Sequence, residues 1–253
     1  MKATLKYLTG IAGPSGYGSK TTADEVAQDC LSSMPTSHQL TAIVTGATSG
    51  IGAETARVLA KRGVRVVIPA RDLRSRKGEG EHTRESPEAD IILEIDLSSF
   101  ASIQRFCSEF LSLGLPLHIL INNAGKYSQK LEFSEDKIEL TFATNYLEML
   151  LGKMVETASQ SYIQGRIVNV SSVIHNWVDR KHFCFSKLLS PKSYNGTRAY
   201  AQSKLANILH AKELARQLKG AATTCYVALS PQTVGLAAKY FADCNESRAH
   251  SGK

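Results

Sequence analysis

From Leu40 onward, short runs of β-branched and other apolar residues alternate with longer stretches in which apolar residues recur at helical spacing. The apolar runs predict five strands, at residues 41–45, 64–68, 91–95, 117–121 and 166–170. Strands that are apolar at nearly every position are typical of parallel sheets that are buried on both faces. The alternation therefore predicts an α/β fold, a doubly wound parallel sheet of the Rossmann type.

Two of the intervening stretches predict helices especially clearly. Between the first two strands, Ile51, Thr55, Val58 and Leu59 share one helical face, and Gly63 is well placed to end that helix. A second helix is predicted over residues 200–218 from the spacing of its apolar positions. Residues 1–38 are rich in Gly, Ser and Thr without sustained periodicity. They are therefore interpreted as an extension laid on or beside a domain of residues 39–253.

Composition narrows the class of protein. With 43% hydrophobic and 21% charged residues, the chain is close to an average globular protein, which excludes collagen-like, disordered and disulfide-scaffold classes. No apolar run approaches the ~20 residues of a membrane-spanning helix, and the N-terminus lacks the apolar core of a secretory signal. Five scattered cysteines show no metal-ligand spacing, so we expect reduced thiols, no metal site and an intracellular location.

The net charge of +7 favours anionic partners such as phosphates, nucleic acid or a lipid surface. The densest basic stretch, residues 71–84, is interleaved with Glu and is surrounded by no nucleic-acid motif. It is interpreted as a solvated loop, and no nucleic-acid partner is predicted.

The first predicted strand leads directly into a glycine-rich turn, residues 45–52 (TGATSGIG), inside which a helix begins. Gly46 allows a tight turn, Gly50 lets the backbone approach a pyrophosphate, and Gly52 lets the helix pack closely on the strand. The N–H groups of the helix N-terminus are then available to the anion. This context predicts dinucleotide binding, with contacts from Gly46, Ser49, Gly50, Ile51 and Gly52.

The residue after the second strand bears on the choice of cofactor. An acidic residue at this point accepts hydrogen bonds from the ribose 2′-hydroxyl of NAD, whereas this chain has Arg71. A guanidinium suits a 2′-phosphate, so NADP is predicted over NAD, although an exposed Arg beside Asp72 is also compatible with a simple solvated charge.

Several motifs in this order resemble the short-chain dehydrogenase/reductase family. They are TGATSGIG from Thr45, NNAG at residues 122–125, Asn145, Ser172 after the fifth strand, and YAQSK at residues 200–204. The resemblance runs from about Leu40 to Leu218. Within the family, a plant branch is resembled by four stretches, GPSGYGSKTTADEV from Gly13, GRIVNVSS from Gly165, RAYAQSKLAN from Arg198 and GAATTCYVAL from Gly220. That branch includes retinol-dehydrogenase-like enzymes and the dehydrogenase associated with the chloroplast inner-envelope translocon. That branch implies a chloroplast location, otherwise a cytoplasmic one, and a possible translocon partner.

The spacing of Tyr200 and Lys204 predicts acid–base chemistry without reference to the family. Four residues apart on a helix, the two side chains reach the same face. A free Tyr titrates near 10, so action near neutrality needs about 4 kcal/mol of preferential stabilisation of the phenolate. The Lys204 ammonium and a cationic nicotinamide both contribute to this stabilisation. Tyr200 is then the proton donor or acceptor for a small apolar carbonyl or alcohol substrate.

The family resemblance implies roles for further residues. Ser172 would hydrogen-bond the substrate oxygen, Lys204 would also hold the nicotinamide ribose, and Asn145 would hold water in a proton relay. The resemblance assigns the adenine to Asp96 and Leu97 and the cofactor ribose to Asn123, within the NNAG turn that also supplies Ala124 and Gly125. Each residue also has a structural alternative: Ser172 as a cap, Asn145 as a polar group inside a helix, and Asp96 as the cap of the next helix.

The segment between Ser172 and Tyr200 is longer than a simple connection between a strand and a helix. Its aromatic residues predict either an apolar wall for the substrate or packing against their own domain. They are Trp177, Phe183, Phe185 and Tyr194.

After the catalytic helix, the chain departs from the family pattern. We expect the sixth parallel strand and the segment covering the substrate to be missing, and residues 227–233 are not accepted as that strand because Gln232 follows Pro231. Such a loss would expose a strand edge and open the nicotinamide site to water. Two alternatives to an NADP(H)-dependent oxidoreductase therefore stay open: a non-catalytic, nucleotide-responsive regulator of a partner such as the translocon, and an inactive truncated form.

Overall fold

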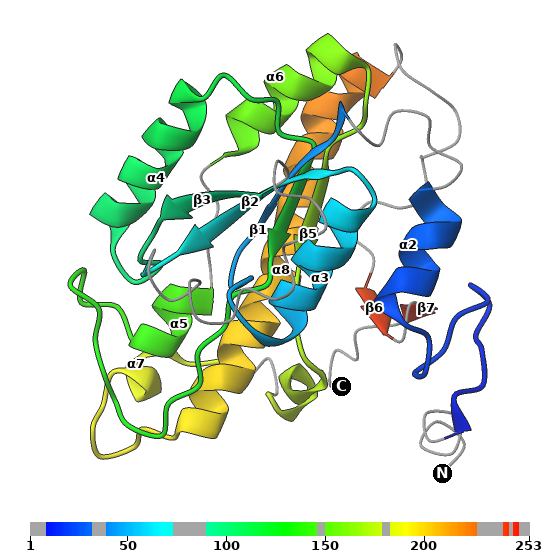
Figure 1. Cartoon of the computed structure of the whole chain (residues 1–253). Helices are drawn as coiled ribbons and strands as arrows, with labels where there is room; N and C mark the ends of the chain where they lie inside the picture. Colours follow the sequence, from blue (N-terminus) through cyan, green and yellow to red (C-terminus); the bar gives the residue numbers. More distant parts are fainter. Residues whose placement is uncertain are drawn as a thin grey trace.

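The computed structural model describes residues 9–31, 39–72, 90–145, 150–178, 183–226, 240–242 and 245–247. Its centre is a parallel sheet in the order β3-β2-β1-β4-β5 (Figure 1). The five strands are β1 Thr41–Val44, β2 Arg65–Ala70, β3 Asp90–Glu94, β4 Ile119–Asn122 and β5 Arg166–Asn169. All four strand pairings are parallel, which confirms the predicted doubly wound α/β sheet.

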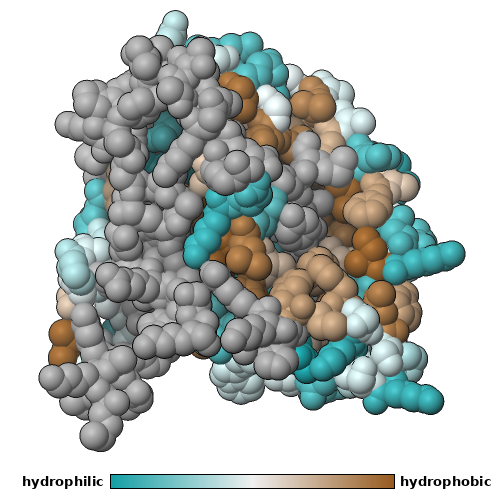
Figure 2. All heavy atoms as spheres, turned by 180° about the vertical axis from the view of Figure 1, so that it is seen from behind, coloured by the Kyte–Doolittle hydropathy of each residue, from teal (hydrophilic) through white to brown (hydrophobic). Residues whose placement is uncertain are grey.

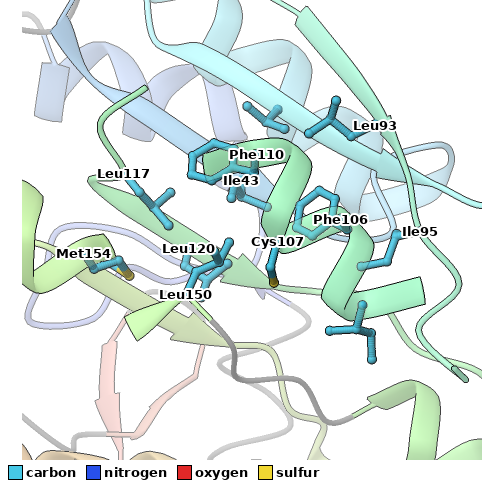
Figure 3. Packing of buried hydrophobic residues seen from close by; sticks show 12 residues of the cluster. Ile43, Leu93, Ile95, Phe106, Cys107, Phe110, Leu117, Leu120, Leu150 and Met154 are labelled. Carbon is cyan, nitrogen blue, oxygen red and sulfur yellow. The ribbon is translucent and has the colours of Figure 1, made fainter. Parts of the chain in front are cut away.

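One face of the sheet carries the largest hydrophobic cluster. Helix α4 (Phe100–Ser112) turns Phe106 and Phe110 onto Ile43 of β1, and α6 (Leu151–Ser161) closes the cluster with Met154 (Figure 3). Phe106 and Phe110 are among the largest fully buried side chains. This cluster fixes β1, β3 and β4, whose carboxyl ends lead into the predicted cofactor residues.

Helix α3 (Gly50–Lys61) covers the opposite face, where Ala56 packs against Val44 and Val66. The helix ends as predicted, with Gly63 in a left-handed conformation at φ +84°. Figure 1 shows α2 (Ala23–Leu31) beside α3 on the outside of the molecule. This helix was not expected from the sequence.

An ion-pair cluster joins α2 to α3. The Asp24 carboxylate lies 2.7 Å from Arg57 Nη2, 3.3 Å from Lys61 Nζ and 3.7 Å from Arg62 Nη2. Glu25 accepts hydrogen bonds from the Thr22 N–H and hydroxyl, which form a capping arrangement at the start of α2. Long-range charge pairing therefore helps to hold this short helix against α3.

The longest helix, α8 (Gly196–Tyr226), begins four residues before the predicted start and extends eight residues beyond the predicted end. It contacts β5, the short helix α5 (Leu140–Asn145) and the 3₁₀ helix η2 (Val173–Trp177). Figure 1 shows α8 running behind the sheet, opposite α3. This arrangement brings the motif at residues 200–204 to the end of β5.

Within the described residues, the sheet ends at β5, and the expected loss of a sixth strand stays a prediction. Val168 on β5 is 45% exposed, whereas Val44 of β1, which lies in the same row of the sheet through Ile121 of β4, is fully buried. A separate antiparallel pair, β6 (Tyr240–Ala242) and β7 (Asn245–Ser247), follows, while residues 227–233 lie outside the described part. Seen from behind, the molecule shows apolar side chains at its surface among hydrophilic ones (Figure 2).

Candidate active site

The predicted site residues gather at one edge of the sheet, because they follow parallel strands whose carboxyl ends lie together. The glycine turn follows β1, Arg71 follows β2, Asp96 follows β3 and Asn123 follows β4. Ser172 comes three residues after β5. The strand order reverses at β1, and such a switch point is where open α/β sheets bind ligands.

Each glycine of the turn is favoured at its position for its own structural reason. Gly46 (φ +64°) and Gly50 (φ +57°) adopt left-handed conformations. A Cβ at Gly46 would lie 2.8 Å from Ala124 Cα, and one at Gly52 would collide with the Gly46 carbonyl and the Asn123 amide. A Cβ at Gly50 would meet nothing within 4 Å. The turn is thus packed on its inner side and open at Gly50.

The N-terminus of α3 faces the same open side. Ser49 is the N-cap, yet its side chain makes no capping hydrogen bond, so the first N–H groups of the helix lack this side-chain partner. Ile51, the second residue of α3, is 78% exposed, so its side chain does not cover the turn. An open glycine and a helix N-terminus without a side-chain cap fit the pyrophosphate of a dinucleotide.

Thr45 ties this turn to the end of β4, a role that sequence reasoning did not assign. Its buried hydroxyl accepts hydrogen bonds from the backbone N–H groups of Asn123 and Ala124, each at 3.0 Å. The Asn123 side-chain amide donates to the carbonyls of Thr45 at 2.9 Å and Gly46 at 3.4 Å. Thr45 belongs to the glycine motif, but only the fold shows that its hydroxyl meets a chain segment 78 residues away.

The residues after β2 and β3 form the next part of the site at the carboxyl ends of the strands. Asp96 accepts hydrogen bonds from the Ser98 N–H at 2.8 Å and from its hydroxyl at 2.6 Å. Burial alone would raise the pKa of Asp96, but these bonds and the nearby charges of Arg71 and Lys126 lower it overall. Ser99, not Asp96, is the N-cap of α4, so the alternative role of Asp96 as that cap is wrong.

Arg71 is exposed directly after β2, and Leu97 is half-buried against the main core. Residues 73–89, which hold the rest of the basic stretch, lie outside the described part. Gly125 is exposed at the end of the turn that follows β4.

Ser172 begins η2 and caps it, since its hydroxyl accepts a hydrogen bond from the Ile174 N–H at 3.4 Å. Its carbonyl lies 2.6 Å from Nδ1 of the buried His175. Helix η2 packs against α8, with Val178 in one hydrophobic cluster with Ala201 and Leu205. Capping does not conflict with the predicted substrate contact, because η2 packs against α8, the helix that contains Tyr200.

Tyr200 and Lys204 lie one turn apart on α8, as their spacing predicted. The Lys204 Nζ is 5.6 Å from the centroid of the Tyr200 ring, and Lys204 is only 3% exposed. Nζ donates a hydrogen bond to the Val170 carbonyl at 3.2 Å. Burial raises the pKa of the Tyr200 phenol and lowers the pKa of the Lys204 ammonium.

Asn145 is the last residue of α5, and α5 contacts α8. For Asn145 itself, the structure describes the backbone alone. The structure therefore brings the element carrying Asn145 to the helix of Tyr200 and leaves the relay role of its side chain a prediction.

The aromatic residues of the segment before α8 divide between surface and interior contacts. Trp177 is 75% exposed. Phe185 forms edge-on ring pairs with Phe183 at 5.1 Å and Phe142 at 5.5 Å. Phe183 and Phe185 therefore contact aromatic rings of their own domain, although Phe185 is 54% exposed, while Trp177 lies at the surface.

Tyr194 and Tyr127 hold this segment near Tyr200. The Tyr194 hydroxyl donates to the Glu139 carboxylate at 2.9 Å, and burial, then this bond, raises the pKa of Tyr194 to about 12. The Tyr127 ring lies edge-on to Tyr200, with centroids 5.8 Å apart, and its hydroxyl is 3.1 Å from the Thr197 hydroxyl. No sequence signal marks Tyr127 except its place just after the NNAG turn.

Within the ranges that the structure describes, no helix has the length and apolar character needed to cross a bilayer. Over the same residues, no three His, Cys, Asp or Glu side chains are grouped as a metal site would require.

Comparison with known proteins gives a consistent result. Residues 40–231 match the family described as short chain dehydrogenase. Short-chain dehydrogenase TIC 32 B, chloroplastic, from Brassica napus is 40% identical over 290 aligned positions, covering 94% of this chain and 89% of that protein. Retinol dehydrogenase 11 from Homo sapiens is 41% identical over 202 positions, covering 76% and 60%.

Among solved structures, an uncharacterized protein from Mycobacterium paratuberculosis is similar with a TM-score of 0.57 and 33% identity, covering 76% of this chain and 67% of that one. The alignment with the Brassica napus protein spans 290 positions, which exceeds the 253 residues of this chain. That relative therefore has internal segments with no counterpart here.

Proposed function

The chain belongs to the short-chain dehydrogenase/reductase family of oxidoreductases, and on that premise we propose that it transfers hydride between NADP(H) and a carbonyl or alcohol substrate. Tyr200 is the acid–base group in this proposal, assisted by Lys204 and Ser172. The observation that carries it is the convergence of the half-buried Tyr200 beside the buried Lys204, of Ser172 and of the open glycine turn at the carboxyl end of the sheet.

Burial shifts the pKa of Tyr200 upwards, opposite to the lowering expected from Lys204, so in this proposal the lowering depends on the bound, cationic cofactor. Because burial raises the pKa of Tyr200, the phenol is protonated near neutral pH and can donate to a carbonyl oxygen. When bound, the cofactor supplies or takes up the hydride. In reduction, the substrate oxygen gains the proton of Tyr200, and in oxidation Tyr200 removes it. Carbonyl reduction should therefore be favoured towards lower pH, and alcohol oxidation should increase with pH.

The residues around the turn fit a dinucleotide in distinct ways. Residues 46–52 would hold the pyrophosphate, since Gly50 is open and the α3 N-terminus lacks a side-chain cap. Asp96 and Leu97 would contact the adenine, and Asn123 and Lys204 would contact ribose hydroxyls. Because the Asn123 amide already donates into the turn, we expect its part in binding to be mainly the placement of that turn.

The preference for NADP rests on Arg71. A guanidinium that contacts a 2′-phosphate contributes a charge-assisted interaction of about 1.5–3 kcal/mol, or about 10- to 150-fold in affinity. Thermal-shift titrations with NADPH and NADH test this preference. Arg71→Ala should lose the discrimination, whereas Arg65→Ala, which removes an exposed charge at the opposite end of β2, should retain it. Equal binding of both nucleotides by the unaltered protein would contradict the proposal.

Replacement of the phenol tests the mechanism. Tyr200→Phe should abolish carbonyl reduction while NADPH still binds, as followed by NADPH oxidation and by fluorescence titration. Tyr162→Phe is the matched control, because Tyr162 is exposed at the end of α6, and the variant should turn over normally. Undiminished turnover by Tyr200→Phe would refute the assigned role.

A chloroplast location and association with an envelope translocon are a second proposal, supported by the 40% identity to a chloroplastic relative named TIC 32 B. A fluorescent fusion in plant cells tests the location, and co-purification with translocon subunits tests the association. NADPH binding without turnover over a broad carbonyl panel, together with such co-purification, would favour the regulator over the enzyme.

A further inference from the structure

One backbone carbonyl at the end of β5 accepts two side-chain donors from α8. Lys204 Nζ and Asn207 Nδ2 each lie 3.2 Å from the Val170 oxygen. Lys204 is 3% exposed and Asn207 4% exposed, whereas Val170 is half-buried, so both donors are largely shielded from water. A carbonyl oxygen has two lone pairs, and it can accept both donors at once.

The position of this carbonyl is fixed independently of the two donors. The Val170 N–H donates to the Asn122 carbonyl at 3.0 Å, which continues the pairing of β5 with β4. The Ser171 hydroxyl donates to the Lys204 carbonyl at 2.8 Å, which attaches the backbone of α8 to the same strand end. Loss of one side-chain donor would therefore leave strand and helix joined.

The two donors differ in what else they can reach. Tyr200, Lys204 and Asn207 are spaced four and three residues apart, so they share one face of α8. The Lys204 ammonium has three N–H groups and lies close to the Tyr200 ring, whereas Asn207 is a turn further from the phenol. If Lys204 turns towards a bound ribose and the phenol, Asn207 still satisfies the Val170 oxygen.

We propose that Asn207 is a positioning residue that holds the Val170 carbonyl, and so releases Lys204 for the cofactor and Tyr200. The inference rests on the proposed function. Without the Asn207 amide, the release of Lys204 would leave the half-buried Val170 carbonyl without either of these donors, so the ammonium would stay on Val170. Binding of the nicotinamide half of the cofactor then becomes weaker, because it must displace the only remaining donor.

Binding of NADPH is compared with binding of adenosine 2′,5′-bisphosphate, which lacks the nicotinamide ribose, by calorimetry on the full chain. Asn207→Leu, which is similar in size, should weaken NADPH about tenfold or more and leave the bisphosphate unchanged. Ser171→Ala removes a different hydrogen bond between β5 and α8, so it should lower thermal stability but keep the ratio of the two affinities.

The outcomes separate the inference from the proposed function. Equal loss of both affinities in Asn207→Leu, or no loss of either, would overturn the positioning role. A change of the ratio in Ser171→Ala similar to that in Asn207→Leu would also overturn it, because the effect would then belong to the junction in general. If the unaltered protein bound neither nucleotide, the proposed function itself would fail.

Discussion

The Thr45 hydroxyl offers the sharpest test of how the cofactor turn is held. It is buried, and it accepts hydrogen bonds from the N–H groups of Asn123 and Ala124 at 3.0 Å each. Thr45→Val keeps the shape of the side chain and removes the acceptor. The Asn123 N–H retains its bond to the Ile121 carbonyl at 3.0 Å, so Ala124 loses the acceptor that its N–H has in the structure.

One buried N–H without an acceptor costs about 1–3 kcal/mol, and we expect Thr45→Val to lower the free energy of unfolding by about 2 kcal/mol. Thr45→Ser is the matched control. It keeps the acceptor and loses one methyl group, for which we expect a loss of about 1 kcal/mol. Urea unfolding of the unaltered protein and the two variants measures both losses, provided that the three curves have the same m-value.

Cofactor binding separates the two variants further. Because Thr45 joins β1 to the turn after β4, Thr45→Val should also weaken NADPH binding, whereas Thr45→Ser should bind NADPH as the unaltered protein does. If Thr45→Val were no less stable than Thr45→Ser and bound NADPH equally well, the hydroxyl would not hold the turn and the reasoning would be refuted.

Three further variants test other contacts. His118 Nδ1 accepts the Thr41 N–H at 3.0 Å, and burial lowers the pKa of its ring. The folded state therefore favours neutral His118, so the free energy of unfolding should fall as the pH drops below about 6.5. His118→Gln should flatten this fall in urea titrations, and an unchanged pH dependence would show that the ring is not its cause. Hydrogen bonds from Arg57 and then Lys61 lower the pKa of Asp24 despite some burial, so its contribution is present above the usual Asp range and is lost in acid. Asp24→Asn should speed hydrogen exchange in α2 alone, and unchanged exchange would count against the ion pairs. Tyr194→Phe should lower the free energy of unfolding by about 1–2 kcal/mol, since its hydroxyl donates to a buried carboxylate, and an unchanged urea midpoint would contradict that bond.

The five strands were predictable because each is an apolar run, but their limits depended on pairing. The sequence prediction ended the second strand at Ile68, before Pro69, and β2 in fact continues to Ala70. Pro69 is tolerated because the pairing of β2 with β1 ends at Val67, whereas the pairing with β3 continues opposite Leu93. At this point β2 is an edge strand on one side, where a missing N–H costs little.

Elements held by distant contacts were less predictable. Helix α2 spans only nine residues, too few for a sustained pattern, and its place depends on an ion pair with Arg57, 33 positions away, a separation that no local pattern reports. The early start of α8 has a local sequence signal in Asn195, a preferred N-cap residue. Its side chain accepts a hydrogen bond from the Arg198 N–H at 2.9 Å. Asn207 carries a weaker signal: it lies three residues after Lys204 and so on the same helical face.

These contacts divide the candidate site into two parts that differ in how they are supported. The cofactor turn lies above β1 and β4, whose side chains belong to the main cores and whose ends are tied by Thr45 and Asn123. The catalytic part depends on β5, the last strand of the sheet among the described residues, which is partly exposed at Val168. There, two side-chain hydrogen bonds join the end of β5 to α8, from Ser171 to the Lys204 carbonyl and from Asn207 to the Val170 carbonyl. Loss of family segments after α8 should therefore affect the alignment of Tyr200 and Lys204 more than nucleotide binding, which is why binding and turnover have to be measured separately.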